Sequence, residues 1–263
     1  KTFLMKYDLK DTTFVFVVRI DSIIRLENLL LALELLESNF DTHILVVEAS
    51  YYNNGILKRL LSNKVSYSFI EDKDPIFHRT KHLNAILKQL NTAIIGVWEA
   101  DIIMESTQIM DAVYQLRVEN CDFAFPYDGR CFDTSEILRR HYLLYKNIGF
   151  LKNNIYKMDL LYSSSSKGNA VGGAFLISVE KYKYSGLENE CFYGWGAEDG
   201  ERYYRWLILN YRMYRSQGVL FHLSHPRDQN GMIRSDYHET KIMHEYFKIR
   251  NSTKEELINK LHK

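Results

Sequence analysis

The sequence predicts an α/β fold: a mixed, mostly parallel sheet flanked by helices. The first observation is a set of short, continuous apolar runs, typical of strands buried on both faces. The second is that a segment with apolar residues at helical spacing follows each run, and this alternation is typical of a parallel sheet. The apolar runs are residues 14–18, 44–47, 65–70 and 93–97.

The helical segments and the second half of the chain complete this prediction. We expect helices at residues 26–36, 56–61, 81–90 and 107–116. After residue 120 the expected strands are shorter, at 123–125, 174–179 and 219–223, with an aromatic-rich helix from 201 to about 214. We therefore expect one domain over residues 1–234, in two halves that divide near residue 120. Residues 235–263 read as a tail of two polar helices.

Composition excludes several classes of protein. The chain has 263 residues and a net charge of +1, so bulk charge does not favour a nucleic-acid partner. Its three cysteines lack metal-type spacing, which indicates reduced thiols in a reducing compartment. No apolar run approaches the ~20 residues of a membrane span, and we expect a cytoplasmic protein.

The most informative segment, residues 192–199, reads Phe-Tyr-Gly-Trp-Gly-Ala-Glu-Asp. The indole of Trp195 has a flat apolar face that suits a sugar ring. The carboxylates of Glu198 and Asp199 follow it, and a carboxylate beside such a face can accept a proton from a hydroxyl. The alternative is an acidic first helical turn, which the helix dipole favours by itself.

Two further motifs contain groups that could bind a metal ion. Glu99 and Asp101 follow an expected strand two residues apart, and paired carboxylates repel unless a cation or proton lies between them. His222 and His225 lie three residues apart where Pro226 ends an apolar run, and imidazole suits Mn, Zn or Fe. Each motif taken alone could equally be a pair of ordinary surface residues.

Other polar groups lie at the ends of expected strands or at a helix start. Arg19 and Asp21 follow the first strand and Glu48 follows the second, where open α/β sheets bind ligands. Residues 77–84 open a helix with basic and amide groups that could meet phosphate oxygens, or could simply be solvated. Gly172 and Gly173 precede a strand as a hinge or a turn.

In this order, the motifs resemble the galactosyltransferase-type glycosyltransferases of the GT-A fold, notably the β-1,4-galactosyltransferases. Residues 193–199 are similar to the family's Trp-Gly-Trp-Gly-Gly-Glu-Asp, and residues 99–101 to its Asp-Val-Asp. Residues 222–228 are similar to its Met-Ile-Arg-His-Ser-Arg-Asp, and residues 77–84 to its Phe-Asn-Arg-Ala-Lys-Leu-Leu-Asn. The similarity covers roughly residues 14–230, and the Trp-Gly-x-Glu-Asp motif is its specific part.

The resemblance implies a role for each candidate residue. Asp199 would be the general base, with Glu198 binding sugar hydroxyls. The implied ligands of Mn²⁺ are Asp101, His222 and His225. The residues implied to hold the nucleotide and its phosphates are Arg19, Asp21, Arg25, Glu48, Arg79, Lys81, Asn84 and Glu99. The residues implied to contact the substrate sugars are Trp195, Tyr193, Gly173 and Tyr127.

The implied function is metal-dependent, inverting transfer of a sugar from a UDP-sugar to a saccharide acceptor in surface-polysaccharide or glycolipid synthesis, by a bacterial relative of the family. Galactose or N-acetylgalactosamine is the first expectation. Residues 1–120 would then bind the nucleotide and residues 121–234 the acceptor, and a glycolipid acceptor would bring the protein to the cytoplasmic face of a membrane. Glu99, Ala197 and His222 depart from the family's Asp, Gly and Met. Two alternatives stay open: a metal-dependent hydrolase or phosphodiesterase, and a non-catalytic saccharide-binding protein.

Overall fold

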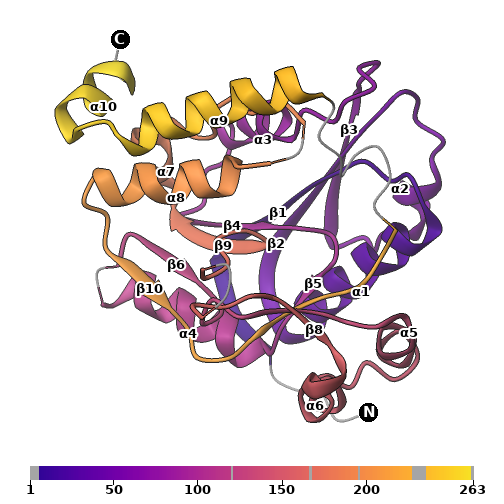
Figure 1. Ribbon diagram of the computed structural model, residues 1–263. Helices are drawn as coiled ribbons and strands as arrows, with labels where there is room; N and C mark the ends of the chain where they lie inside the picture. Colours follow the sequence, from indigo (N-terminus) through magenta and orange to yellow (C-terminus); the bar gives the residue numbers. More distant parts are fainter. Residues whose placement is uncertain (1–5, 120, 166–167, 195, 227–234, 262–263) are drawn as a thin grey trace.

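The computed structural model describes residues 6–119, 121–165, 168–194, 196–226 and 235–261 (Figure 1). Its centre is a seven-stranded sheet in the order β10-β6-β9-β4-β1-β2-β3. Strands β1 to β4 pair in parallel, whereas β9 is antiparallel to both of its neighbours, β4 and β6. The predicted mixed, mostly parallel α/β fold is confirmed. The bounds are β1 Tyr7–Val18, β2 Phe40–Ser50, β3 Val65–Glu71, β4 Ile94–Trp98, β6 Phe123–Phe125, β9 Ala174–Ser178 and β10 Met213–Arg215.

The centre of this sheet is packed from both sides, as continuous apolar runs require. In β1, Phe14, Val15 and Phe16 are all fully buried. Gly96 in β4 leaves room for the ring of Phe14, because a Cβ there would lie 2.7 Å from Phe14 Cδ1. A larger residue at position 96 would therefore overpack the core.

Helices cover both faces of the sheet. Helices α1 and α4 pack together on one face, and α3, α7, α8 and α9 (Asp236–Arg250) lie on the other (Figure 1). Ser22 caps α1 by accepting a hydrogen bond from the Arg25 backbone N–H at 3.2 Å. The helix bounds are α1 Ile23–Asn39, α2 Ile56–Leu60, α3 Arg79–Leu87, α4 Ser106–Arg117, α7 Val179–Tyr184 and α8 Glu198–Ile208.

A second, four-stranded sheet in the order β5-β11-β7-β8 lies beside the first, and only β11 was predicted. Strand β5 is antiparallel to β11, which is parallel to β7. The other three strands have two to four residues each, too short for a period to be read from the sequence. The bounds are β5 Ile102–Ile103, β7 Cys131–Asp133, β8 Asp159–Tyr162 and β11 Leu220–His222. Two helices, α5 Glu136–Tyr145 and α6 Ile148–Asn153, and the 3₁₀ turn η1 Ile155–Lys157 connect β7 to β8.

The helix predicted from 201 to about 214 has different bounds. Helix α8 begins at Glu198 and ends at Ile208, and Asn210 then adopts a left-handed conformation with φ 63°. The chain continues as β10, which pairs in parallel with β6. Pairing with a distant strand decides the end of this helix, and a local apolar pattern does not report such pairing.

The tail forms helices α9 Asp236–Arg250 and α10 Lys254–Leu261, and α9 runs alongside α8 (Figure 1). Ile249 and Leu257 are buried within the main core, so the tail is packed against the domain. A domain boundary at residue 234 stays a prediction, because residues 227–234 lie outside the described part. Among the described residues, no helix has the length and apolar character needed to cross a membrane.

Candidate active site

A large cleft of about 870 Å³ opens beyond the ends of β1 and β4. It brings together residues from both halves of the chain and from the tail. The predicted site residues that line it are Arg19, Arg25, Arg79, Glu99, Asp101, Gly173, Glu198, Asp199, His222 and His225.

Three of these side chains form one compact cluster. Asp101 directly precedes β5, and the antiparallel pairing of β5 with β11 brings it beside His222. Asp101 Oδ2 lies 2.9 Å from His225 Nε2 and 3.7 Å from His222 Nε2. One potential ligand atom from each residue lies within 4.8 Å of the others. Residues more than 120 positions apart in sequence could thus share one ion.

Asp133, at the end of β7, fixes the orientation of His222. Its Oδ1 lies 2.8 Å from His222 Nδ1, so Nε2 is the ring nitrogen that faces Asp101. Burial lowers the pKa of His222, but Asp101 and Asp133 raise it by more, and the net pKa lies above its ordinary value. An outer carboxylate that orients a histidine is typical of metal sites. Asp133 was not among the predicted site residues, because β7 was not predicted from the sequence.

The cluster fits a divalent cation such as Mn²⁺. Asp101 Oδ1 is buried and has no hydrogen-bond partner within the described part of the chain. Burial raises the pKa of Asp101, but His222 and His225 more than offset this, and the carboxyl stays ionised. One carboxylate and two imidazoles are suitable donors for Mn²⁺ and leave positions for other ligands.

Two arginines line the cleft beside its acidic groups. The Arg25 Nε donates to Asp21 at 3.0 Å, and its Nη1 lies 3.9 Å from Asp101 Oδ2. Arg79, at the start of α3, has a buried Nη1 without a partner among the described residues. Glu99, Asp199 and Glu198 raise the pKa of Arg79 against the effect of burial, which keeps the guanidinium charged. An anionic ligand would find two cations here.

The carboxylates of Glu198 and Asp199 begin α8. Ala197 precedes them in a left-handed conformation, φ 63°, which turns the chain into the helix. The Asp199 carboxylate packs against Gly172, where a Cβ would lie 2.2 Å from Asp199 Oδ2. Burial, and then the charge of Asp199, raise the pKa of Glu198 to about 7. Glu198 can therefore hold a proton near neutral pH while its neighbour faces the same cleft.

Glu99 is close enough to interact with the charges of both Asp101 and Asp199. Its pKa is raised by burial, an effect that Arg79 opposes and that Asp199 and Asp101 reinforce. Its backbone N–H donates to the carbonyl of Gly173 at 2.8 Å. Gly173 has φ 78°, and the Gly-Gly pair forms a turn just before β9, so that the Gly173 carbonyl bonds to the residue that follows β4.

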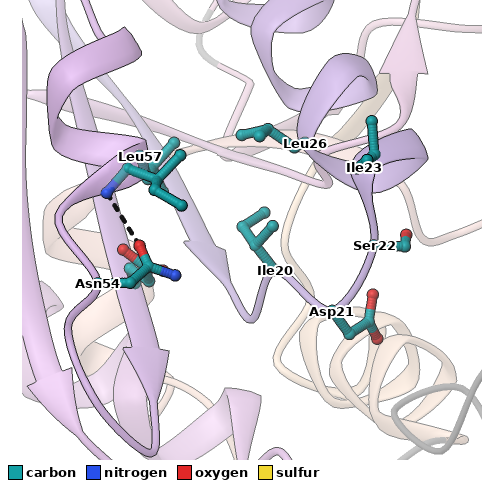
Figure 2. A pocket seen from close by; sticks show the side chains of 9 residues that line it. Ile20, Asp21, Ser22, Ile23, Leu26, Asn54 and Leu57 are labelled. Carbon is teal, nitrogen blue, oxygen red and sulfur yellow. Dashed lines mark hydrogen bonds between the residues drawn. The ribbon is translucent and has the colours of Figure 1, made fainter.

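A smaller cavity of about 230 Å³ lies next to the cleft, between α1 and α2 (Figure 2). Asp21 and the buried Glu48 supply its acidic groups, and the side chains of Ile20, Leu26 and Leu57 supply apolar walls. The hydroxyl of Tyr67 donates to Glu48 Oε2 at 2.7 Å.

Arg19 also lines the cleft, but its hydrogen bonds go to the protein. Its Nη2 pairs with Asp72 at 2.6 Å, and its other nitrogens donate to backbone carbonyls of Ala49, Asp74 and Pro75. This network ties the end of β1 to the loop after β3.

Among the described residues, four predicted site residues line neither the cleft nor the smaller cavity. Lys81 is exposed on α3, and the buried amide of Asn84 bonds to residues 188 and 190. Tyr127 is buried behind the glycine turn, and its hydroxyl donates to the Gly172 carbonyl at 2.6 Å. Tyr193 donates its hydroxyl to Asp74. Trp195 lies outside the described residues.

Helix α9 forms a wall of the cleft that the sequence analysis did not predict. Glu239, Ile242, Met243 and Tyr246 line it, at the spacing of one helical face. Tyr246 lies over Gly200, where a Cβ would be 3.1 Å from its ring. The wall is therefore next to Asp199.

Comparison with solved structures places this architecture. A mannosyltransferase from Pyrobaculum calidifontis, solved with GDP-Man and Mn²⁺, superposes with a TM-score of 0.54 at 14% identity, over 84% of this chain and 58% of the other. A mutant of β-1,4-galactosyltransferase 7 from Drosophila, solved with manganese, UDP-Gal and xylobiose, superposes with a TM-score of 0.54 at 13% identity, over 88% of this chain and 79% of the other. The chain has the GT-A fold. At these identities the likeness shows the fold alone. No protein-family model and no curated protein matches the sequence.

Proposed function

We propose that this GT-A protein is a metal-dependent, inverting glycosyltransferase that moves a sugar from a nucleotide-sugar to a saccharide or glycolipid acceptor. One observation carries the proposal: the cluster of Asp101, His222 and His225 shares a cleft with the carboxylates of Glu198 and Asp199. The motif resemblance favours a UDP-sugar, with galactose or N-acetylgalactosamine transferred.

Asp101, His222 and His225 would hold the cation, with Asp133 orienting His222. When bound, the ion would supply Lewis-acid stabilisation of the negative charge on a departing diphosphate. Arg25 and Arg79 would add fixed positive charge for the phosphate oxygens. Arg19 would act indirectly, since its hydrogen bonds already go to protein atoms.

Asp199 would accept the proton of the acceptor hydroxyl as that oxygen bonds to the anomeric carbon. The bond from this carbon to the diphosphate breaks on the opposite side, and the electron pair leaves with the nucleoside diphosphate, so the anomeric configuration inverts. Glu198, with a pKa of about 7, can donate a hydrogen bond to a sugar oxygen at neutral pH. The two adjacent acids would thus have different roles.

The smaller cavity suits the nucleoside. Its apolar walls can cover the faces of a base, and the carboxylates of Glu48 and Asp21 can accept from base or ribose donors. The α9 wall suits the acceptor, because Tyr246 and Met243 lie on the Asp199 side of the cleft. Aromatic faces next to acids are typical of saccharide sites. A glycolipid acceptor would bring the protein to the cytoplasmic face of a membrane.

A thermal-shift screen of UDP- and GDP-sugars, each with and without Mn²⁺, tests the donor. Mass action raises the melting temperature only for a ligand that binds the folded state, and the expected increase for a UDP-sugar requires Mn²⁺. An Asp199→Asn variant should keep this shift and lose transfer by several orders of magnitude, since the asparagine cannot accept the proton. Near-normal turnover by this variant would remove Asp199 from the proposed role. Release of free sugar without any acceptor would instead favour a hydrolase.

A further inference from the structure

Arg202 lies one turn beyond Asp199 in α8 and is almost fully buried. Its Nη2 bonds to Asp199 Oδ1, and its Nη1 bonds to Glu188 Oε2 at 2.8 Å. The guanidinium carbon lies 4.2 Å from the ring centroid of Phe175, which packs against its face. Burial lowers the pKa of Arg202, but the two carboxylates raise it by more, and it stays charged. The guanidinium of Arg202 therefore bridges Asp199, which faces the cleft, and Glu188, which lies in the core.

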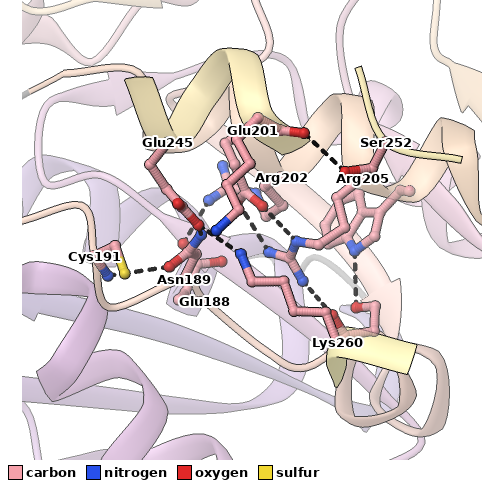
Figure 3. A network of polar contacts seen from close by, with 12 residues as sticks. Glu188, Asn189, Cys191, Glu201, Arg202, Arg205, Glu245, Ser252 and Lys260 are labelled. Carbon is pink, nitrogen blue, oxygen red and sulfur yellow. Dashed lines mark hydrogen bonds and ion pairs between the residues drawn. The ribbon is translucent and has the colours of Figure 1, made fainter. Parts of the chain in front are cut away.

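Glu188 is fixed from several sides (Figure 3). Its side chain is fully buried, and the Tyr182 hydroxyl donates to its Oε1. Asn84 holds its backbone in both directions, donating to the Glu188 carbonyl at 2.9 Å and accepting from the Glu188 N–H at 2.8 Å. Glu188 is thus a rigid anchor for Arg202. Asn84, which the family resemblance implied would hold the nucleotide, instead bonds to this anchor.

We propose that Arg202 is a positioning residue for Asp199, and that Glu188 balances the positive charge that Arg202 places beside the Asp199 carboxylate. The inference rests on the proposed function. An unbalanced cation within about 4–6 Å lowers a carboxyl pKa by about 1–3 units. A general base weakened in this way accepts a proton less readily. The Glu188 carboxylate offsets that effect, while the guanidinium still fixes the direction of the Asp199 side chain.

Other charged groups around Asp199 set the background for this effect. Arg79 from α3 is the second cation near it. Glu99, after β4, and Glu198 are the neighbouring acids, and Tyr127 lies behind the glycine turn. These groups remain in all variants of Arg202 and Glu188, so differences between the variants report the Arg202–Glu188 pair.

The next turn of α8 offers a matched control. Arg205 is as buried as Arg202 and pairs with the buried Glu201, with Nε to Oε1 at 2.8 Å (Figure 3). Arg205 also donates to the Ser185 carbonyl, and within the described part of the chain none of its hydrogen bonds reaches Asp199. A loss caused by general disruption of a buried ion pair would appear equally at both arginines.

The experiment measures the pH profile of kcat for sugar transfer, with the melting temperature of every variant recorded. Arg202→Met should lower kcat roughly 10- to 100-fold, because Asp199 is no longer positioned. It should also move the acidic limb of the profile, where kcat falls as Asp199 is protonated, to higher pH, because Asp199 loses a neighbouring cation. Glu188→Gln should move that limb to lower pH by about one unit, because the cation is no longer balanced. The double variant should keep the limb near the wild-type pH and still lose kcat, since positioning is absent.

Arg205→Met should leave the limb in place whatever its effect on stability. If Arg202→Met does not fold, Glu188→Gln and the double variant decide the question. The inference would be overturned if the acidic limb does not move in Arg202→Met and Glu188→Gln, or if it moves in the same direction in both. Asp199→Asn separates this result from the proposed function: if that variant still transfers sugar, the base assignment itself is wrong.

Discussion

Folding raises the pKa of Glu198, and this shift predicts how the free energy of unfolding depends on pH. Burial and the adjacent Asp199 raise its pKa from 4.5 to about 7. At about 1.4 kcal/mol per pH unit, this difference corresponds to about 3 kcal/mol. A carboxyl whose pKa is raised by folding binds its proton more tightly in the folded state. The resulting stabilisation is present below pH 4.5 and is lost as the pH rises to about 7.

Glu198→Gln removes the charge and keeps the shape, and its amide oxygen can still accept from the Gly196 N–H, which lies 3.1 Å from Glu198 Oε2. The variant should therefore exceed the wild type in free energy of unfolding by up to about 3 kcal/mol at pH 8, and by little near pH 4.5. The assay is urea denaturation in EDTA at pH 5 and pH 8. Glu119→Gln, at an exposed position after α4, is the control and should show no such pH-dependent difference. A Glu198→Gln protein that is no more stable than wild type at pH 8 would show that folding does not raise the pKa of Glu198.

Two other predictions concern the groups that hold the site. Gly172→Ala should reduce transfer roughly 100-fold with donor binding intact, because its Cβ would lie 2.2 Å from Asp199 Oδ2 and displace that carboxylate. Steady-state kinetics with separate donor and acceptor KM values check this prediction, and an unchanged kcat would contradict it. Asp133→Ala should weaken Mn²⁺ binding about 10- to 100-fold, because His222 loses the partner at 2.8 Å that orients its ring. Calorimetric titration of Mn²⁺ measures that loss, and an unchanged affinity would show that Asp133 does not support the site.

The first half of the fold could be predicted because its strands are continuous apolar runs. Strands β1 to β4 were predicted as runs 14–18, 44–47, 65–70 and 93–97, each shorter than the strand itself or shifted by a residue. Residues 7–13 extend β1 beyond its apolar part, because Tyr7, Asp8 and Leu9 pair with β2 and Thr12 pairs with β4. Such pairing follows from the neighbouring strand, so the local sequence does not report it.

Candidate site residues were predicted where they belong to short sequence motifs. They were missed where their role depends on contacts with distant parts of the chain. Asp101, His222 and His225 were grouped through motif resemblance, and the structure brings them together through the pairing of β5 with β11. Asp133 belongs to a segment with no motif, and only the tertiary structure places it against His222. Arg202 bonds to Asp199 one helical turn away, but the predicted helix began at residue 201 and left Asp199 outside it. The only signal for Arg202 in the sequence is its position three residues after Asp199 on a helix.

The most direct test of the central claim is a crystal of the protein soaked with Mn²⁺ and UDP, measured for anomalous scattering from manganese. We expect one strong anomalous peak, from an ion bound by Asp101, His222 and His225 and by the diphosphate, with the Asp199 carboxylate facing the same cleft. A manganese peak away from these three side chains, or a diphosphate bound outside this cleft, would contradict it.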